Sequence, residues 1–587
     1  MSSGNGEKLI STDVLVIGGG IGGCFAAVKA KEQGLDVTIV DKNYVGKSGA
    51  THFAEGDLMC FNPERGHKLN EWMDRVNKGC EYLNNREWSE IILKEARQVY
   101  KDLLSWGVKF YEEGGEVHVN NINFYGQPTL WENVHMLNRK YAPVFRKKAL
   151  ESGIRILDRI MIGELLKQDG IIVGAVGFDT TNGDLYILKA KATVMVTGTA
   201  SLNKTEKMPL HFLTGDGECM AYRAGAEITG KEFKFGQYLF ANGGGGAKVP
   251  VRETSGPWQI NDLWDHYPAF RIDELALKGQ PIINVEGEVQ TNPHWAVHLG
   301  QAPLFRDLDT ITDEQMEWIK RFFRRVGTAQ PDKVGLDITK RGKLKYPGEM
   351  HLVAQILGGG HGIWPVNTKC ATALPGLYAA GDCCGTRASG ALYAGFGWGL
   401  NHAPITGTRA GLAAAEYASQ SKEISIDEAV LASIKKIVCS PVERKGGFTP
   451  GWVMQVLQGY TVPYYVLQIK HGERLQATLA LVEFLNNHIV PKLVAKDAHE
   501  WRMAYEAKNM VLNAEMVLRA SLYRTESRGS HFREDFPRRD DPTWLAWVKL
   551  RDEQGKMKAL KEPVPKKWWP DLSEPYEKRY PSRFPLE

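Results

Sequence analysis

Short, unbroken apolar runs alternate with longer amphipathic stretches along the first third of this chain. The runs Val14–Ile17, Val37–Val40 and Ala192–Gly198 consist mostly of aliphatic and small residues. Such runs are typical of strands buried on both faces of a parallel sheet. A turn signal at Thr181–Asp184, just before the third run, indicates a small antiparallel insertion. The pattern therefore predicts an α/β domain with a mostly parallel sheet.

Three glycines follow the first apolar run in the spacing G-x-G-x-x-G. Gly18 suits a tight turn, Gly20 lets the backbone approach a pyrophosphate, and Gly23 lets the next helix pack closely on the strand. The second run ends at Asp41, 23 residues after Gly18, where a carboxylate accepts hydrogen bonds from ribose hydroxyls. Because strand, glycines, helix, strand and acid occur in this order, an incidental loop is the weaker interpretation. The unit predicts dinucleotide binding.

Other stretches have helical periodicity or a distinct composition. Residues 70–107 place apolar side chains at the spacings of amphipathic helices, and residues 499–537 have a period close to 3.6. Glycine, tryptophan and proline become frequent between 232 and 346, which indicates a domain inserted into the dinucleotide-binding fold. The tail from Arg538 has too little apolar periodicity for a domain of its own. It could wrap the surface, or its tryptophans and lysines could form a protein interface.

Composition narrows the class of protein. The chain has 587 residues, 43% hydrophobic and 24% charged, with a net charge of +4. These values are ordinary for a folded protein of several domains and do not favour nucleic acid binding. The N-terminus lacks the apolar core of a signal peptide and no run of about 18 apolar residues occurs, so we expect a cytoplasmic protein without a transmembrane segment. The eight cysteines show no C-x-x-C spacing, so we expect no metal or cluster site in this chain.

Several segments resemble the fumarate reductase and succinate dehydrogenase flavoprotein superfamily. Ser48–Gly56, Thr214–Gly217 and Pro375–Asp382 match its flavin-wrapping segment, its T-G-D-G turn and its second signature. The resemblance implies a Rossmann-like FAD-binding domain with an inserted α+β capping domain and a C-terminal helical domain. The predicted boundaries are 1–235 and 347–415 for the FAD-binding domain, 236–346 for the cap, 416–537 for the helical domain and 538–587 for the extension.

The resemblance also implies which residues hold FAD. Asp216 is expected to cap a helix, Asp382 to bond the ribitol, and the helix expected from about Ala388 to direct its N-terminal amides at the flavin. Ala50 stands where membrane-bound members carry a histidine that attaches the flavin, so we expect non-covalent FAD. The predicted cofactor-binding residues are Gly18, Gly20, Gly22, Gly23, Asp41, Lys42, Ser48, Gly49, Ala50, Glu55, Gly56, Thr197, Gly198, Asp216, Gly381, Asp382, Ser389 and Ala391.

The substrate residues depart from the superfamily. Tyr393 replaces the arginine that clamps a carboxylate, and tyrosine cannot reproduce a bidentate contact, which argues against a dicarboxylate. His361 follows three glycines and could contact substrate or flavin and move a proton near neutral pH; alternatively, backbone carbonyls satisfy it. Arg252 and Arg271 lie in the cap, where they could bind substrate or be solvated surface charges. The predicted catalytic residues are His361, Tyr393, Arg252 and Arg271.

Residues 499–537, with the motif R-x-E-S-R-G-x-H-x-R-x-D-x-P, and the G-I-W after His361 make the chain most similar to the adenylylsulfate reductase alpha subunit. The resemblance implies an FAD-dependent oxidoreductase that exchanges electrons between a small substrate and a ferredoxin-like iron–sulfur subunit, with 4Fe–4S clusters only in that partner. Two alternatives stay open. One is reduction or oxidation at an activated C=C bond or a quinone-like substrate; the other is a purely electron-transferring flavoprotein.

Overall fold

A computed structural model describes most of the chain. The described residues are 6–54, 56–121, 132–137, 141–202, 213–233, 361–395, 397–422, 425–580, 583–584 and 586–587, together with the short strands β14 to β18 and two single residues between 237 and 357. Within these residues, no helix has the length and apolar character needed to cross a membrane.

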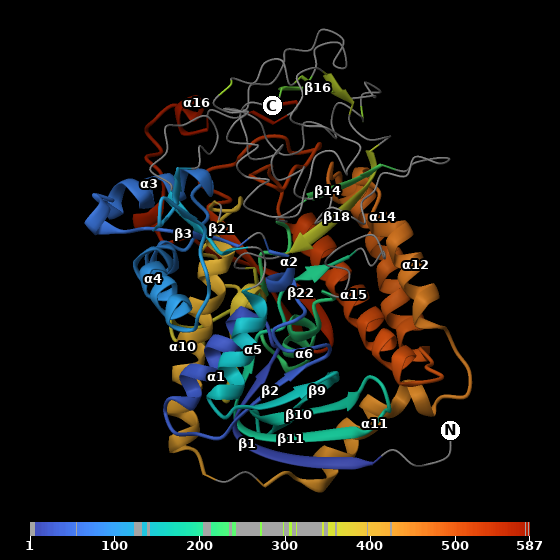
Figure 1. The fold of residues 1–587 in the computed structure, drawn as a ribbon. Coiled ribbons are helices and arrows are strands. Elements are labelled where there is room, and N and C mark those ends of the chain that lie inside the picture. The colour runs from blue at the N-terminus through green and yellow to red at the C-terminus, as the bar shows by residue number, and fades with distance from the viewer. Residues whose placement is uncertain are drawn as a thin grey trace.

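A seven-stranded sheet forms the base of the molecule in Figure 1. Its order is β8-β2-β1-β11-β10-β9, and β20 also pairs with β11. The pairs of β1 with β2 and β11, of β2 with β8 and of β11 with β20 are parallel, whereas β9, β10 and β11 form an antiparallel meander. The strands are β1 Glu7–Ile17, β2 Val37–Asp41, β8 Arg155–Asp158, β9 Ile160–Gln168, β10 Ile171–Asp179, β11 Leu185–Met195 and β20 Leu377–Ala379. The predicted α/β fold is confirmed.

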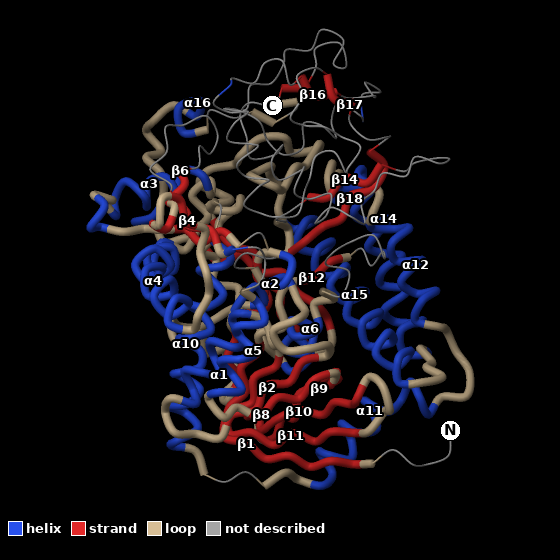
Figure 2. Tube along the Cα trace, viewed as in Figure 1, coloured by secondary structure: helices blue, strands red, loops and turns tan. Residues whose placement is uncertain are grey.

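Alternate residues of β1 face two different cores. Val14 and Val16 pack in the core with α1 (Ile21–Lys31), α5 (Ala142–Glu151) and α10 (Trp398–Gln420). Leu15 and Ile17 point the other way, into a core shared with α6 (Asp216–Ala224) and α15 (Ala498–Tyr523). Because period-2 alternation sends successive side chains to opposite faces, a continuous apolar run requires cover on both sides. Figures 1 and 2 show these helices on either side of the sheet.

Two helices and a small sheet extend the FAD-binding fold. The predicted amphipathic helices are α3 (Leu69–Gly79) and α4 (Arg86–Ser105). The sheet β3-β7-β6 combines Asp57–Met59, Glu132–His135 and Val119–Asn121, and β4 (Glu112–Glu113) pairs with β5 (Glu116–Val117) beside it. Of the predicted cap, the structure describes β14 (Gln237–Ala241), β15 (Arg271–Ile272), β16 (Phe305–Asp307) and β17 (Lys343–Lys345); β18 (Met350–Leu357) pairs with β14 and with β12 (Ala200–Ser201).

The C-terminal third is mainly helical, as expected. Its helices are α11 Glu428–Glu443, α12 Pro450–Thr461, α13 Tyr464–Leu467, α14 Gly472–Phe484 and α15, with a π-helical turn at Leu485–Ile489 and a 3-10 turn at Val490–Lys492. α15 is the longest and lies against the sheet domain on one side and against α12 and α14 on the other.

The tail after Arg538 is built into the fold. β21 (Ala546–Glu553) and β22 (Lys556–Pro563) form a hairpin, and α16 (Tyr576–Arg579) follows. β21 also pairs with β13 (Ile228–Thr229), which in turn pairs with β19 (Gly362–Ile363). Trp544 and Trp547 are buried, so of the two interpretations of the tail, the protein interface cannot include these two side chains. Long-range strand pairing, which leaves little periodic signal in so short a segment, integrates the tail.

Candidate functional site

The turn after β1 has the backbone geometry that its glycines suggested. Gly18 has φ +115°, and a Cβ there would lie 2.2 Å from the carbonyl oxygen of Val196. A Cβ at Gly23 would lie 1.9 Å from the carbonyl oxygen of Gly18. Gly20 precedes α1 as its N-cap and Gly22 lies in its first turn; the N–H of Ile21 donates to Thr51 Oγ1 at 3.1 Å, and the helix end with its positive dipole faces the turn. The turn can therefore hold a pyrophosphate close to the backbone.

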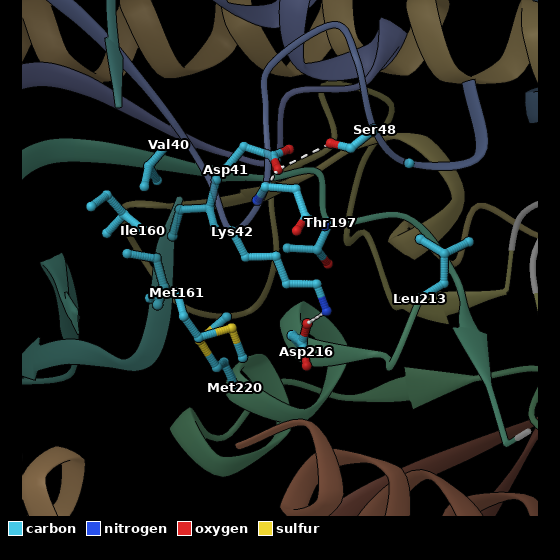
Figure 3. A pocket seen from close by; sticks show the side chains of 15 residues that line it. Val40, Asp41, Lys42, Ser48, Ile160, Met161, Thr197, Leu213, Asp216 and Met220 are labelled. Carbon is cyan, nitrogen blue, oxygen red and sulfur yellow. Dashed lines mark hydrogen bonds and ion pairs between the residues drawn. The ribbon is translucent and has the colours of Figure 1, made fainter. Parts of the chain in front are cut away.

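A cleft opens where β1 and β2 end (Figure 3). Asp41 accepts hydrogen bonds from the N–H groups of Gly19 and Asn43, at 2.8 and 2.7 Å, and from the hydroxyl of Ser48 at 3.3 Å. Burial raises the pKa of Asp41 above its usual value, against the effect of these donors. The carboxyl thus lies oriented at the end of β2, where a ribose would be bound. Seven of the predicted cofactor residues line this cleft: Gly18, Asp41, Lys42, Ser48, Gly49, Thr197 and Asp216.

Lys42 joins this cleft to the helical domain. Its Nζ lies 2.7 Å from Asp216 Oδ2 and 3.1 Å from Glu506 Oε1 on α15. Asn509, also on α15, donates to Asp216 Oδ1 at 2.8 Å. α6 begins at Asp216 as expected, but its N-cap is Gly215 and no side chain caps it. The expected capping role of Asp216 is therefore wrong, because its carboxylate is engaged by Lys42 and Asn509.

The second signature lies beside the first glycine turn. β20 leads to Gly381, whose N–H donates to Thr406 Oγ1 at 2.9 Å, and the N–H of Ala380 donates to the carbonyl of Met195 at 2.9 Å. Asp382 follows and is half-buried. Gly198, with φ +76°, turns the chain away after β11. The parallel pairing of β11 and β20 thus brings together segments that lie far apart in the sequence, as a dinucleotide site requires.

α10 begins at Trp398, not near Ala388 as expected. Gly395 and Gly397 have φ of +146° and +79°, which interrupts a helix before that point. The hydroxyl of Tyr393 accepts a hydrogen bond from the N–H of Gly399 at 2.5 Å, so this side chain caps the first turn of α10. Tyr393 therefore has a structural role beside its predicted catalytic one.

Several buried polar atoms lack a partner near this helix. Among the residues that the structure describes, Ser389 Oγ, Asn401 Oδ1 and His402 Nδ1 are buried and make no hydrogen bond within the chain. Burial also lowers the pKa of His402 to about 4. Each unsatisfied group costs about 1–3 kcal/mol, which a polar ligand offsets. Ala391, another predicted cofactor residue, is buried against the C-terminal motif, and its carbonyl accepts a hydrogen bond from the N–H of Ser530.

The flavin-wrapping segment also fits non-covalent FAD. Gly49, with φ +81°, precedes the one-turn helix α2 (Ala50–Phe53). Gly56 has φ +95°, and a Cβ there would lie 2.9 Å from the carbonyl oxygen of Met136. Ala50 offers no nucleophile for a covalent bond to the ring. The donors, glycine turns and unsatisfied atoms together match the demands of FAD, which supplies two-electron chemistry when bound.

His361 is buried beside an arginine that the sequence did not single out. Its Nδ1 lies 2.9 Å from the carbonyl oxygen of Gly230, and Nη1 of Arg387 lies within hydrogen-bonding distance of both ring nitrogens. Burial, and then the charge of Arg387, hold the pKa of His361 well below its usual range. This direction favours a neutral imidazole, and the contact with the carbonyl of Gly230 is the one that the alternative interpretation of His361 expected, while its role at the substrate stays a prediction. Arg387 stands alone among small residues just after the second signature, and this isolated charge is the sequence feature that could have pointed to it.

Arg387 and Lys470 are buried basic side chains whose hydrogen-bond partners are backbone carbonyls and imidazoles. Within the described part of the chain, neither forms an ion pair: Arg387 also donates to the carbonyl of Gly390, and Lys470 contacts the carbonyl of Glu232 and Nδ1 of His531. Burial lowers the pKa of Arg387 to about 10 and that of Lys470 to about 7. By contrast, the neighbouring Arg524 pairs with Glu232 and Glu526. Among the described residues, this region therefore holds two buried basic side chains outside any ion pair, with the carboxylate of Glu232 acting on both.

Three predicted residues cannot be placed in this arrangement. Glu55 and Arg252 lie outside the described residues, and Arg271 lies on β15, where the structure describes the backbone only. Also within the described residues, no group of three or more histidine, cysteine or acidic side chains is arranged to hold a metal.

Comparisons with known proteins agree with this geometry. Residues 13–242 match the FAD binding domain family, and residues 463–580 match the fumarate reductase flavoprotein C-terminal family. An uncharacterized FAD-dependent oxidoreductase of Methanocaldococcus jannaschii is 28% identical, covering 90% of this chain and 94% of that protein. One subunit of the CoM/CoB fumarate reductase of Methanothermobacter marburgensis is 26% identical, covering 93% and 98%.

Solved structures show the same fold. The adenylylsulfate reductase of Archaeoglobus fulgidus superposes with a TM-score of 0.75 at 22% identity, covering 96% of this chain and 97% of that one. An adenosine-5-phosphosulfate reductase with a covalent sulfite adduct gives the same score, identity and coverage. The two family matches, the relatives that span nearly the whole chain and the shared fold lead to one conclusion: this chain is an FAD-dependent oxidoreductase, similar over nearly its whole length to the flavoprotein subunits of fumarate reductases and succinate dehydrogenases.

Proposed function

We propose that the chain is the flavoprotein subunit of an adenylylsulfate-reductase-like complex. In this proposal a small oxyanionic substrate exchanges two electrons with FAD, and an iron–sulfur subunit carries the electrons singly to or from the flavoprotein. The observation that carries the proposal is the pair His361 and Arg387, which are buried together beside the second signature, with no carboxylate of the described residues in an ion pair with the arginine. An anion at this place would offset the cost of burying that charge.

The roles of the two side chains follow from their charge states. Arg387 has donors to spare and attracts an oxyanion, and its planar fork suits an oxygen pair. His361 is neutral, so it can donate one hydrogen bond or accept one without competing for the anion. Tyr393 is turned toward the first turn of α10, which leaves the anion contact to Arg387.

The test is an anaerobic titration of the FAD-loaded protein, with the flavin oxidised for sulfite and chemically reduced for fumarate and for a neutral quinone. We expect sulfite to perturb the flavin absorbance saturably and the neutral quinone not to do so. If only the quinone exchanges electrons with the flavin, the oxyanion proposal is wrong.

Reduction of an activated C=C bond is a second candidate, because a relative that covers 93% of this chain is named as a fumarate reductase. Fumarate should then reoxidise the chemically reduced flavin within the assay, whereas sulfite should not. Tyr393, in place of the clamping arginine, argues for the first candidate.

The iron–sulfur partner would dock on the basic face of the tail. β22 is an edge strand, and Lys556, Lys558 and Lys566 on and after it are exposed, with Trp568 and Trp569 half-buried beside them. An acidic ferredoxin-like surface complements this face, and such steering weakens with salt. Because β21 belongs to the sheet with β13, truncating the tail would disturb the fold, so charge reversal is the better test.

We expect the native complex to contain iron and acid-labile sulfide in addition to FAD. The double variant Lys556→Glu/Lys566→Glu should lose most of the partner and of electron transfer to it, while keeping FAD. Lys147→Glu on α5 is the matched control, since Lys147 is equally exposed but lies far along the chain from β22. A flavoprotein that purifies alone and turns over at full rate with a free acceptor would contradict the partner proposal.

A further inference from the structure

A second pocket lies behind the wall of the FAD cleft. It lies between α6, α11, the π-helical turn at Leu485–Ile489, the 3-10 turn after it and α15, and it has a volume of about 320 Å³. This size is in the range of small-molecule sites. Its lining residues are Tyr222, Arg223, Ile437, Ser440, Pro441, Arg444, Asn486, Val490, Pro491, Leu493, Ala504, Tyr505, Lys508 and Leu512.

The pocket lining combines apolar side chains with basic ones. Most of the wall is apolar or aromatic, and the charged residues among the described lining are all cations: Arg223, Arg444 and Lys508. Glu164, behind the wall, pairs with both Arg223 and Lys508, at 2.9 and 2.6 Å, so one carboxylate serves two cations. Arg444 makes a hydrogen bond to the carbonyl of Leu493 but forms no ion pair within the described chain. The pocket thus combines apolar walls with excess positive charge.

The pocket shares its wall with the FAD cleft. Asn509 lies between them, fully buried: its Nδ2 donates to Asp216 in the cleft at 2.8 Å, and its Oδ1 accepts from Arg223 of the pocket at 2.9 Å. Glu164 belongs to β9, whose first residues, Ile160 to Ile162, line the cleft. α6 also contributes to both sites, through Asp216 to the cleft and through Arg223 to the pocket. A change in the pocket therefore reaches the FAD site through direct hydrogen bonds.

We propose that this pocket binds a small amphipathic anion, with an apolar body against the helices and an acidic group at Arg223, Arg444 and Lys508, and that its occupancy is linked to FAD binding. The anion would neutralise the surplus charge and brace α6 against α11 and α15. Since α6 carries Asp216, the braced helix would hold FAD more tightly. By linkage, FAD would strengthen binding of the anion by the same factor.

The test uses the FAD-loaded protein and 1-naphthalenesulfonate, with naphthalene-1-methanol as the neutral probe of similar shape. We expect one calorimetric binding site for the sulfonate and at least tenfold weaker binding of the alcohol. Ser440→Trp should fill the pocket and lower sulfonate affinity at least tenfold. Ser433→Trp is its matched control, because Ser433 lies exposed on the same helix, outside the pocket.

Two further measurements make the result decisive. Arg444→Glu should weaken sulfonate binding at least fivefold, whereas Lys496→Glu, the same charge change at an exposed site, should not. Saturating sulfonate should slow FAD release from the wild type but not from Ser440→Trp. No saturable binding, or equal binding by wild type and Ser440→Trp, would overturn the pocket, and an unchanged rate of FAD release would overturn the link.

Discussion

The two ends of the cofactor region differ in how their buried basic side chains are paired. At the end of β2, Lys42 forms ion pairs with Asp216 and with Glu506. Beside the second signature, Arg387 and Lys470 are also buried, and their hydrogen-bond partners in the described part of the chain are carbonyls and imidazoles. Cofactor contacts are permanent, so their charges can be balanced within the chain. A substrate comes and goes, so in the proposed function the basic side chains outside ion pairs would be compensated by the anion when it binds.

Replacing Arg387 should have the largest effect on sulfite binding. Arg387→Met keeps most of the side-chain volume but leaves no donor for an oxyanion. We expect sulfite affinity of the FAD-loaded protein to fall about 100-fold, roughly 2.7 kcal/mol, as for a buried charge-assisted contact. Arg551→Met, at an exposed position, is the control. Flavin absorbance titrations measure both, and equal affinities would remove Arg387 from the site.

His361→Ala should lower turnover about tenfold, roughly 1.4 kcal/mol, with FAD content unchanged. The imidazole is neutral because burial and Arg387 hold its pKa well below its usual range. Steady-state rates of the wild type and of the variant should therefore depend on pH in the same way between pH 6 and 8. A step near pH 6.5 that the variant abolishes would contradict the neutral state.

Lys470 should give the anion site its pH dependence. Its pKa is lowered to about 7 by burial, with Glu232 opposing this and Arg533, Arg524 and His531 lying nearby. The protonated form attracts an anion, so sulfite affinity should fall several-fold as pH rises through 7. Stability should change in the other direction: between about pH 7 and 10.5 the unfolded chain binds the extra proton, so this group makes the folded state more stable as pH rises.

The matched variant is Lys470→Met, in which both sulfite affinity and stability should depend less on pH. Chemical denaturation and absorbance titrations at a series of pH values would show this. An unchanged pH profile in the variant would assign the titration to another group.

The smallest effect should come from Tyr393. Tyr393→Phe removes only the hydroxyl that accepts from Gly399 at the start of α10. Loss of a helix cap costs about 1 kcal/mol, so the unfolding midpoint should shift by a few degrees and FAD affinity by a few-fold at most. Loss of activity at full FAD occupancy would instead support the catalytic role that its position suggests.

Much of the cofactor site could be predicted because its signals are local. Gly18, Gly23 and Asp41 act within one strand, turn and helix, and their spacing follows from the geometry of that unit. Alternation of apolar runs and helical periods likewise predicted the sheet and the helices around it, since one face or two faces of each element must be buried.

Only the tertiary structure decided which distant groups meet. Lys42 and Glu506 are 464 residues apart, Asn509 links two pockets, and β21 joins the sheet next to His361 from the far end of the chain. Sequence spacing carries no record of such contacts, because they arise when separate elements pack. For the same reason the unpaired state of Arg387 was invisible: whether a charge has a partner depends on every element that surrounds it.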